Sequence, residues 1–144
     1  MKTAWWMAAL ALGMAGGVSA QTCPCAGGGT QQVNVQALVN GKTACATRNG
    51  DTWQEFHAAN GDVIDYKRGP NDKTDPSSKV GTWVAGNATR GAQQTVTYNY
   101  GAGQVYSYAV CGAAGGPYLF CNVSSMQGIA GVQLIGNGSS VPCP

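Results

Sequence analysis

Short runs of alternating hydrophobic and polar residues, separated by turn residues, occupy most of the chain after residue 32. The clearest alternation lies at 93–111, where the Gly-Ala-Gly turn at 101–103 would fold one run back onto the next. Strict alternation of this kind predicts β-strands. The large side chains of this hairpin would share one face: Val96, Tyr98, Tyr100, Tyr106, Tyr108 and Val110. That face would belong to a barrel core, or else form an exposed tyrosine ladder for carbohydrate stacking or subunit contact.

Three Asn-Gly dipeptides, at 40–41, 49–50 and 60–61, lie between the first strand-like runs. Asn-Gly favours the two-residue type I′ hairpin turn, in which both central residues take positive φ. The dipeptides therefore predict a meander that begins with a strand before residue 40. A two-residue loop at the third dipeptide would pair His57 with Ile64.

Further strands are expected at about 80–85, 93–100, 104–111, 117–121 and 129–135, and no segment is a convincing helix. We therefore expect an all-β, disulfide-stapled fold: an antiparallel up-and-down meander that closes into a barrel of about eight strands. Closure would remove the exposed edges of an open sheet. The alternative is a β-sandwich, which needs long crossing connections that this chain mostly lacks.

Residues 1–20 read as a signal peptide. Lys2 precedes an apolar stretch from Ala4 to Val18, and Val18-Ser19-Ala20 fits the small-x-small cleavage pattern. The mature chain would be one domain at 21–144 with a Gly-rich, cysteine-containing arm at 21–32. The predicted location is secreted or periplasmic, in a bacterium.

Charge is sparse, with a formal net charge of +2 and no basic stripe, which argues against nucleic acid as the main partner. No other apolar run is long enough to span a bilayer as a helix, so no membrane span is expected after cleavage of the signal.

An even number of cysteines in an exported chain predicts a disulfide framework. The six candidates are Cys23, Cys25, Cys45, Cys111, Cys121 and Cys143. Cys111 and Cys121 would lie opposite each other if their connecting loop centres near Gly116, and that geometry would allow a disulfide between them. Cys23 or Cys25 would then pair with Cys143, and the other with Cys45. Two alternatives stay open: a metal or redox role for Cys23-Pro24-Cys25, and cross-links between subunits.

The predicted register places five chemically capable side chains on one side of the sheet: Trp53, Glu55, His57, Tyr66 and Arg68. They could line a ligand pocket, in which a few polar groups orient the ligand. Glu55 and His57 could instead act as an acid–base pair, or Glu55 and Arg68 could form a surface ion pair. With a single histidine and no EF-hand spacing, neither a metal nor another cofactor is predicted.

Four segments, at 53–57, 65–70, 80–83 and 106–108, resemble a group of small uncharacterised exported bacterial proteins. The architecture is also loosely similar to lipocalin- and avidin-like barrels, and Gly81-Thr82-Trp83 matches the short Gly-x-Trp pattern of lipocalins. The resemblance implies a barrel with a ligand cavity and brings no established activity.

The preferred functional hypothesis is an exported, non-enzymatic binding protein for a small or extended ligand, a small molecule or a glycan. The first alternative is a structural or surface-assembly subunit of the cell envelope or extracellular matrix, which would self-associate. The second alternative is a small enzyme that uses Glu55 and His57.

Overall fold

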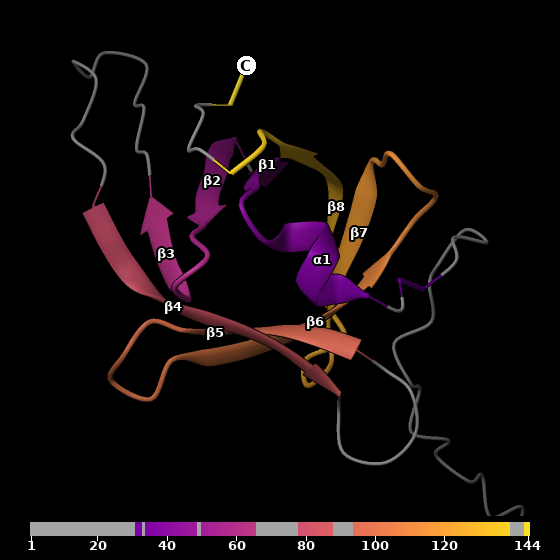
Figure 1. Cartoon of the computed structure of the whole chain (residues 1–144). Coiled ribbons are helices and arrows are strands. Elements are labelled where there is room, and N and C mark those ends of the chain that lie inside the picture. The colour runs from indigo at the N-terminus through magenta and orange to yellow at the C-terminus, as the bar shows by residue number, and fades with distance from the viewer. Residues whose placement is uncertain (1–30, 33, 49, 66–77, 88–93, 139–142) are drawn as a thin grey trace, which may run out of the picture.

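The computed structural model describes residues 31–138 and 143–144, except 33, 49, 66–77 and 88–93. One short helix precedes eight strands: α1 (Val35–Val39), β1 (Thr43–Arg48), β2 (Asp51–His57), β3 (Asp62–Asp65), β4 (Ser78–Asn87), β5 (Gln94–Asn99), β6 (Val105–Cys111), β7 (Tyr118–Asn122) and β8 (Gly128–Ile135). Each strand pairs antiparallel with the next, and β8 pairs with β1 (Figure 1). The predicted closed antiparallel meander is confirmed.

Alternate side chains of each strand point into the barrel and form its core. On β1, Ala44 and Ala46 face inward and pair with the larger Glu55 and Trp53 on β2. Small residues opposite large ones allow the interior of a narrow barrel to fill with side chains. The interior is therefore a packed layer of aromatic and aliphatic groups contributed by every strand.

The register of β1 and β2 is the one predicted from the second Asn-Gly dipeptide. Arg48 pairs with Asp51, and Gly50 takes a φ of +88°. Ala46 consequently pairs with Trp53, which fixes the inward face of β2.

The predicted register at the third Asn-Gly dipeptide is wrong by one residue. His57 pairs with Val63 rather than Ile64, and Glu55 pairs with Asp65. The Ala58 N–H donates to the carbonyl oxygen of Asp62, and the Ala58 carbonyl oxygen accepts from the Gly61 N–H, so the loop has three residues. Of the two turn residues, Gly61 has positive φ, +88°, and Asn60 does not. A type I′ turn needs positive φ at both, so the chain adopts a longer loop instead.

The first Asn-Gly dipeptide ends a helix, so the predicted strand before residue 40 is also wrong. The Asn34 side chain caps the helix by accepting a hydrogen bond from the Ala37 N–H. Gly41 follows the helix with a φ of +69°, and a Cβ there would lie 2.9 Å from the backbone of Gly138. The apolar residues Val35 and Val39 are spaced for one face of a helix as well as for one face of a strand.

The helix α1 closes one end of the barrel. Val35 and Val39 are completely buried, and α1 packs against β4 and β5. The Val35 N–H also donates to Gln94 Oε1 at the start of β5. In Figure 1 this helix lies within the ring of strands. The opposite end, formed by the β1–β2, β5–β6 and β7–β8 connections, is here called the Tyr100 end.

A disulfide joins Cys45 on β1 to Cys143 beside the C-terminus. The Cys143 N–H donates to Gln54 Oε1, so Cys143 lies against the outer face of β1 and β2. The expectation that Cys45 and Cys143 pair with the N-terminal cysteines is therefore wrong. Cys23 and Cys25 lie outside the described residues. A disulfide of this kind indicates an oxidising, extracytoplasmic compartment.

Cys111 and Cys121 are each disulfide-bonded. They do not lie opposite each other on β6 and β7, so that prediction from the sequence is wrong. Cys111 pairs with Leu119, and Cys121 pairs with Ala109. The turn between β6 and β7 is thus centred one residue before the predicted Gly116, which offsets the two cysteines along their strands.

Candidate functional site

The barrel interior contains three of the five predicted site residues. Trp53, Glu55 and His57 alternate along β2 and all face inward. Tyr66 and Arg68 lie outside the described residues. The register that assigned them to this face is the one that proved wrong by one residue between β2 and β3.

Aromatic rings meet in the middle of the barrel around Tyr98, which is completely buried. The Tyr98 ring stacks on Tyr100 with centroids 6.0 Å apart, and it meets Trp53 and Tyr108 edge-on at 6.3 and 5.9 Å. The tyrosine-rich face is therefore barrel core at this depth. It becomes exposed at Tyr106, where 41% of the residue is accessible and the ring contacts Tyr100.

His57 is completely buried and both of its ring nitrogens are hydrogen-bonded. Nδ1 lies 3.0 Å from the carbonyl oxygen of Lys42, so Nδ1 carries the proton and donates it. Nε2 then accepts from the Tyr98 hydroxyl at 2.7 Å. Burial lowers the pKa of His57 from its ordinary 6.5 to about 4, so the ring is neutral at neutral pH. In this arrangement His57 has neither a free nitrogen nor access to a substrate.

Glu55 lies closer to the Tyr100 end and is 7% exposed. The Tyr100 hydroxyl lies 2.8 and 2.7 Å from its two carboxylate oxygens, and the Trp53 side chain also hydrogen-bonds to it. Burial, and to a lesser extent the charge of Asp65, raises the pKa of Glu55 to about 7 despite those hydrogen bonds. Burial and the Glu55 charge raise the pKa of Tyr100 as well, so its hydroxyl remains a donor.

Stability should reveal the raised pKa of Glu55. Between pH 4.5 and 7 the folded state binds more protons at Glu55 than the unfolded state does, so this contribution to stability is lost as the pH rises. At about 1.4 kcal/mol per pH unit, this contribution to the free energy of unfolding totals about 3 kcal/mol. The variant Glu55→Gln has no ionisable group at this position and lacks the contribution. The free energy of unfolding of the variant, minus that of the wild type, should therefore increase by up to about 3 kcal/mol from pH 4.5 to 8.

Urea denaturation of both proteins across this range checks the prediction. His57 has the opposite sign, because its lowered pKa costs stability as the pH falls below 6.5. The two groups thus offset each other in the wild type, and subtracting the variant isolates Glu55. A difference that stays constant with pH would show that Glu55 ionises with an ordinary pKa.

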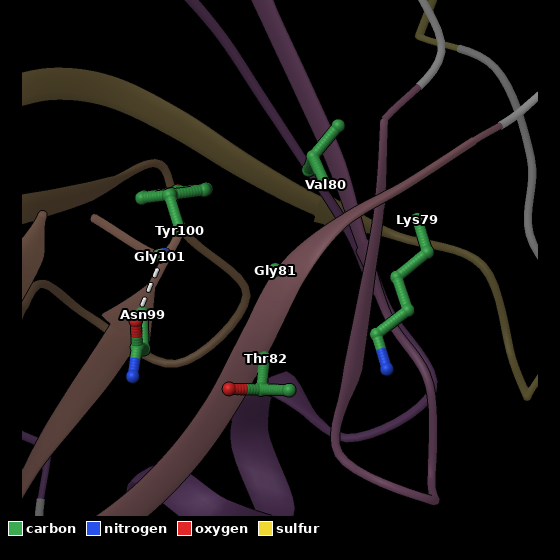
Figure 2. A pocket seen from close by; sticks show the side chains of 7 residues that line it. All are labelled: Lys79, Val80, Gly81, Thr82, Asn99, Tyr100 and Gly101. Carbon is green, nitrogen blue, oxygen red and sulfur yellow. Dashed lines mark hydrogen bonds between the residues drawn. The ribbon is translucent and has the colours of Figure 1, made fainter.

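A shallow pocket of about 420 Å³ opens at the rim of the barrel beside Tyr100. Its lining, shown in Figure 2, is Lys79, Val80, Gly81, Thr82, Asn99, Tyr100 and Gly101. Thr82 and Asn99 are the last paired residues of β4 and β5 toward the Tyr100 end, so the two segments separate beyond them. The pairing of β4 with β3 shifts at the same place, leaving Val80 as an extra residue. Bulges of this kind are frequent at barrel rims and beside functional sites.

The charge on Lys79, which lines this rim pocket, is paired with a carboxylate. Its ammonium forms an ion pair with Asp62, with Nζ 2.6 Å from Oδ1. Figure 2 shows Lys79 on one side of β4, with Asn99 and Tyr100 on the other. The other polar side chains of the lining are neutral: the Thr82 hydroxyl and the Asn99 amide, whose oxygen accepts from the Gly101 N–H.

Gly81 allows β4 to approach Tyr100 closely. A Cβ at this position would lie 2.5 Å from the Asn99 carbonyl oxygen and 3.1 Å from Tyr100 Cδ1. Gly81→Ala should therefore destabilise the protein by roughly 1–3 kcal/mol and displace the Tyr100 ring. Gly86→Ala is the matched control on the same strand, because a Cβ there meets nothing within 4 Å. Equal urea midpoints for the two variants would contradict the close approach.

Sequence reasoning missed Tyr100, Thr82 and Asn99 as site residues. The sequence predicts Tyr100 as part of the tyrosine-rich face, but its contact with Glu55 joins residues 45 apart in the sequence. Gly81-Thr82-Trp83 carries the Gly-x-Trp pattern, which does not indicate that Thr82 lines a pocket. Within the described part of the chain, no three His, Cys, Asp or Glu residues are grouped to hold a metal ion. No helix among the described residues is long and apolar enough to cross a membrane.

Comparison of the chain with protein-family models, with curated proteins and with solved structures finds no match. The fold is an eight-stranded antiparallel barrel, and no family or homologue is identified for it.

Proposed function

We propose that this protein is an exported, non-enzymatic binding protein that holds a small ring-bearing ligand in the rim pocket at the Tyr100 end. The position of Tyr100 carries the proposal. Its ring forms a wall of the rim pocket, while its hydroxyl is hydrogen-bonded to the buried carboxyl group of Glu55. A ligand at the ring would therefore be coupled to the interior of the barrel.

The asymmetry of the barrel supports this location. Apolar residues of α1 are buried in one end, and stacked rings occupy the middle. The Tyr100 end combines partly exposed aromatic rings with a pocket and a few neutral polar groups. Small-molecule sites typically combine apolar and aromatic walls with a small number of polar groups that orient the ligand.

The contacts of His57 favour binding over catalysis. An acid–base role would require His57 to break its hydrogen bonds to Lys42 and Tyr98 and to reach solvent. Export to the periplasm or the medium is supported by the signal-like segment at 1–20 and by the Cys45–Cys143 disulfide.

NMR titration of the isotope-labelled mature protein with small ring-bearing probes tests the proposal. The probes are 2-phenylethanol, 2-phenylethylamine and cellobiose. At least one should shift the amide signals of Gly81, Thr82 and Gly101 in a saturable manner. Thr82→Ala should weaken that response, whereas Thr52→Ala, at an exposed position on β2, should leave it unchanged. Saturable shifts confined to other parts of the barrel, or none from any probe, would contradict the proposal.

A self-associating subunit is the second candidate, because two large apolar residues are exposed on one outer face. Val84 on β4 is 63% exposed and Val105 on β6 is 53% exposed. The register places both on the outward side of β4–β5–β6. Size-exclusion chromatography should then show a concentration-dependent oligomer that Val84→Ser/Val105→Ser abolishes. A monomer at all concentrations would rule this function out.

A further inference from the structure

We propose that Tyr100 and Glu55 form a redox-active pair, in which a one-electron oxidant in solution converts Tyr100 to a neutral tyrosyl radical while Glu55 takes its hydroxyl proton. This activity is separate from ligand binding and does not depend on it. Three observations support it: the hydrogen bond between the two side chains, the burial of Glu55, and the access of Tyr100 to the surface.

The hydrogen bond between Tyr100 and Glu55 supplies the proton acceptor that oxidation of a phenol requires. A phenol that loses one electron becomes a strong acid and releases its hydroxyl proton. The Tyr100 oxygen lies 2.8 and 2.7 Å from the two carboxylate oxygens of Glu55, so the proton only has to move along an existing hydrogen bond. The step breaks the O–H bond of Tyr100, forms an O–H bond on Glu55 and passes the electron to the oxidant.

The burial of Glu55 makes this oxidation more favourable. Before the step, the phenol and the ionised carboxylate carry one negative charge between them, in a place where Glu55 is 7% exposed and charge is costly. After the step, the radical and the protonated carboxyl group are both neutral. The same burial raises the pKa of Glu55 to about 7, so Glu55 holds the proton more firmly than an ordinary carboxylate does.

Tyr98 lacks this advantage, although its hydroxyl also has a base as its partner. It donates to His57 Nε2 at 2.7 Å. Moving that proton would leave a positive charge on a completely buried imidazole, and burial already lowers the pKa of His57 to about 4. The radical is therefore expected on Tyr100, even though the two rings stack on each other.

Tyr100 is accessible to an oxidant outside the barrel by two routes. Its side chain lines the rim pocket, which opens to solvent (Figure 2). Its ring also contacts Tyr106, with centroids 6.1 Å apart, and 41% of Tyr106 is exposed. An electron can leave Tyr100 directly at the rim or through the Tyr106 ring. Return of an electron, together with the proton held by Glu55, restores the pair.

Flash photolysis of the protein with tris(bipyridine)ruthenium(II) and an irreversible electron acceptor tests the proposal. The flash generates ruthenium(III), a one-electron oxidant, and at pH 8 Glu55 is ionised. Electron paramagnetic resonance should then detect a radical whose spectrum changes when the tyrosine rings are deuterated. Tyr100→Phe should remove most of this signal. Tyr118→Phe is the matched control and should leave it unchanged, because Tyr118 is also buried but its hydroxyl accepts from the Gly115 N–H.

Glu55→Gln keeps a polar group beside Tyr100 but removes the proton acceptor. The radical should form about tenfold more slowly or worse, because each pKa unit lost by the acceptor is a factor of ten in the proton-transfer equilibrium. If Glu55→Gln fails to fold, Tyr100→Phe decides the question, since it keeps the ring that stacks on Tyr98. A signal that persists in Tyr100→Phe, or one that tyrosine deuteration does not change, would overturn the proposal. Equally fast formation in a folded Glu55→Gln variant would do the same.

Discussion

Replacing Tyr98 by alanine is expected to lower the free energy of unfolding by roughly 3–5 kcal/mol, as for other buried aromatic residues. Tyr98 is completely buried, and its ring contacts those of Trp53, Tyr100 and Tyr108. Truncation would leave a cavity at the point where these rings meet. The closed sheet around it is hydrogen-bonded on all sides and has little freedom to collapse into the space.

Two companion variants separate the contributions of Tyr98. Tyr98→Phe keeps the ring but leaves His57 Nε2 without its donor, which should cost about 1–3 kcal/mol. Tyr106→Ala removes a partly exposed ring of the same hairpin and should cost far less than Tyr98→Ala. Guanidinium denaturation of the three variants and the wild type provides the comparison. If Tyr98→Ala were no more destabilising than Tyr106→Ala, the aromatic centre would not be where the structure puts it.

Removal of the Cys45–Cys143 disulfide is expected to cost about 2–5 kcal/mol. The bridge joins residues 98 apart, so in the unfolded chain it closes a long loop. Restricting the unfolded state in this way stabilises the folded one, and the effect grows with loop length. Cys45→Ala/Cys143→Ala removes the bridge without leaving a free thiol at either position.

Chemical denaturation of that double variant under non-reducing conditions checks the effect while leaving the disulfides of Cys111 and Cys121 in place. Gln54→Ala is a useful control, because it removes the side chain that accepts from the Cys143 N–H but keeps the covalent bond. It should cost less than the double variant. A double variant as stable as the wild type would mean that the C-terminal bridge does not constrain the unfolded chain.

The strand pattern of the sequence was sufficient to predict the barrel. Alternation at 93–111 predicted a hairpin whose large side chains share a face, and the pairs Val96–Tyr108 and Tyr98–Tyr106 confirm it. Such patterns are informative because successive side chains of a strand point to opposite faces whatever the rest of the fold. The Asn49-Gly50 turn fixed the face of Trp53 in the same way.

The candidate site was predictable in part. Trp53, Glu55 and His57 lie on one strand, so their common face followed from local spacing. The partners of Glu55 and His57 come from β5, and no local pattern specifies which tyrosine reaches which group. The register of β2 and β3 depended on whether Asn60 would take positive φ, and a one-residue shift moves every later side chain to the other face.

The sequence by itself determined the all-β class and the inward face of β2, because these depend on side-chain period and local turn chemistry. It also determined the disulfide-bonded character of the chain, through the number of its cysteines. Only the tertiary structure decided that α1 closes one end, that Cys45 pairs with Cys143, and that Tyr100 joins Glu55 to the rim pocket. Those contacts join segments far apart in the chain. They depend on barrel closure, and closure brings the segments together only when every strand is in register.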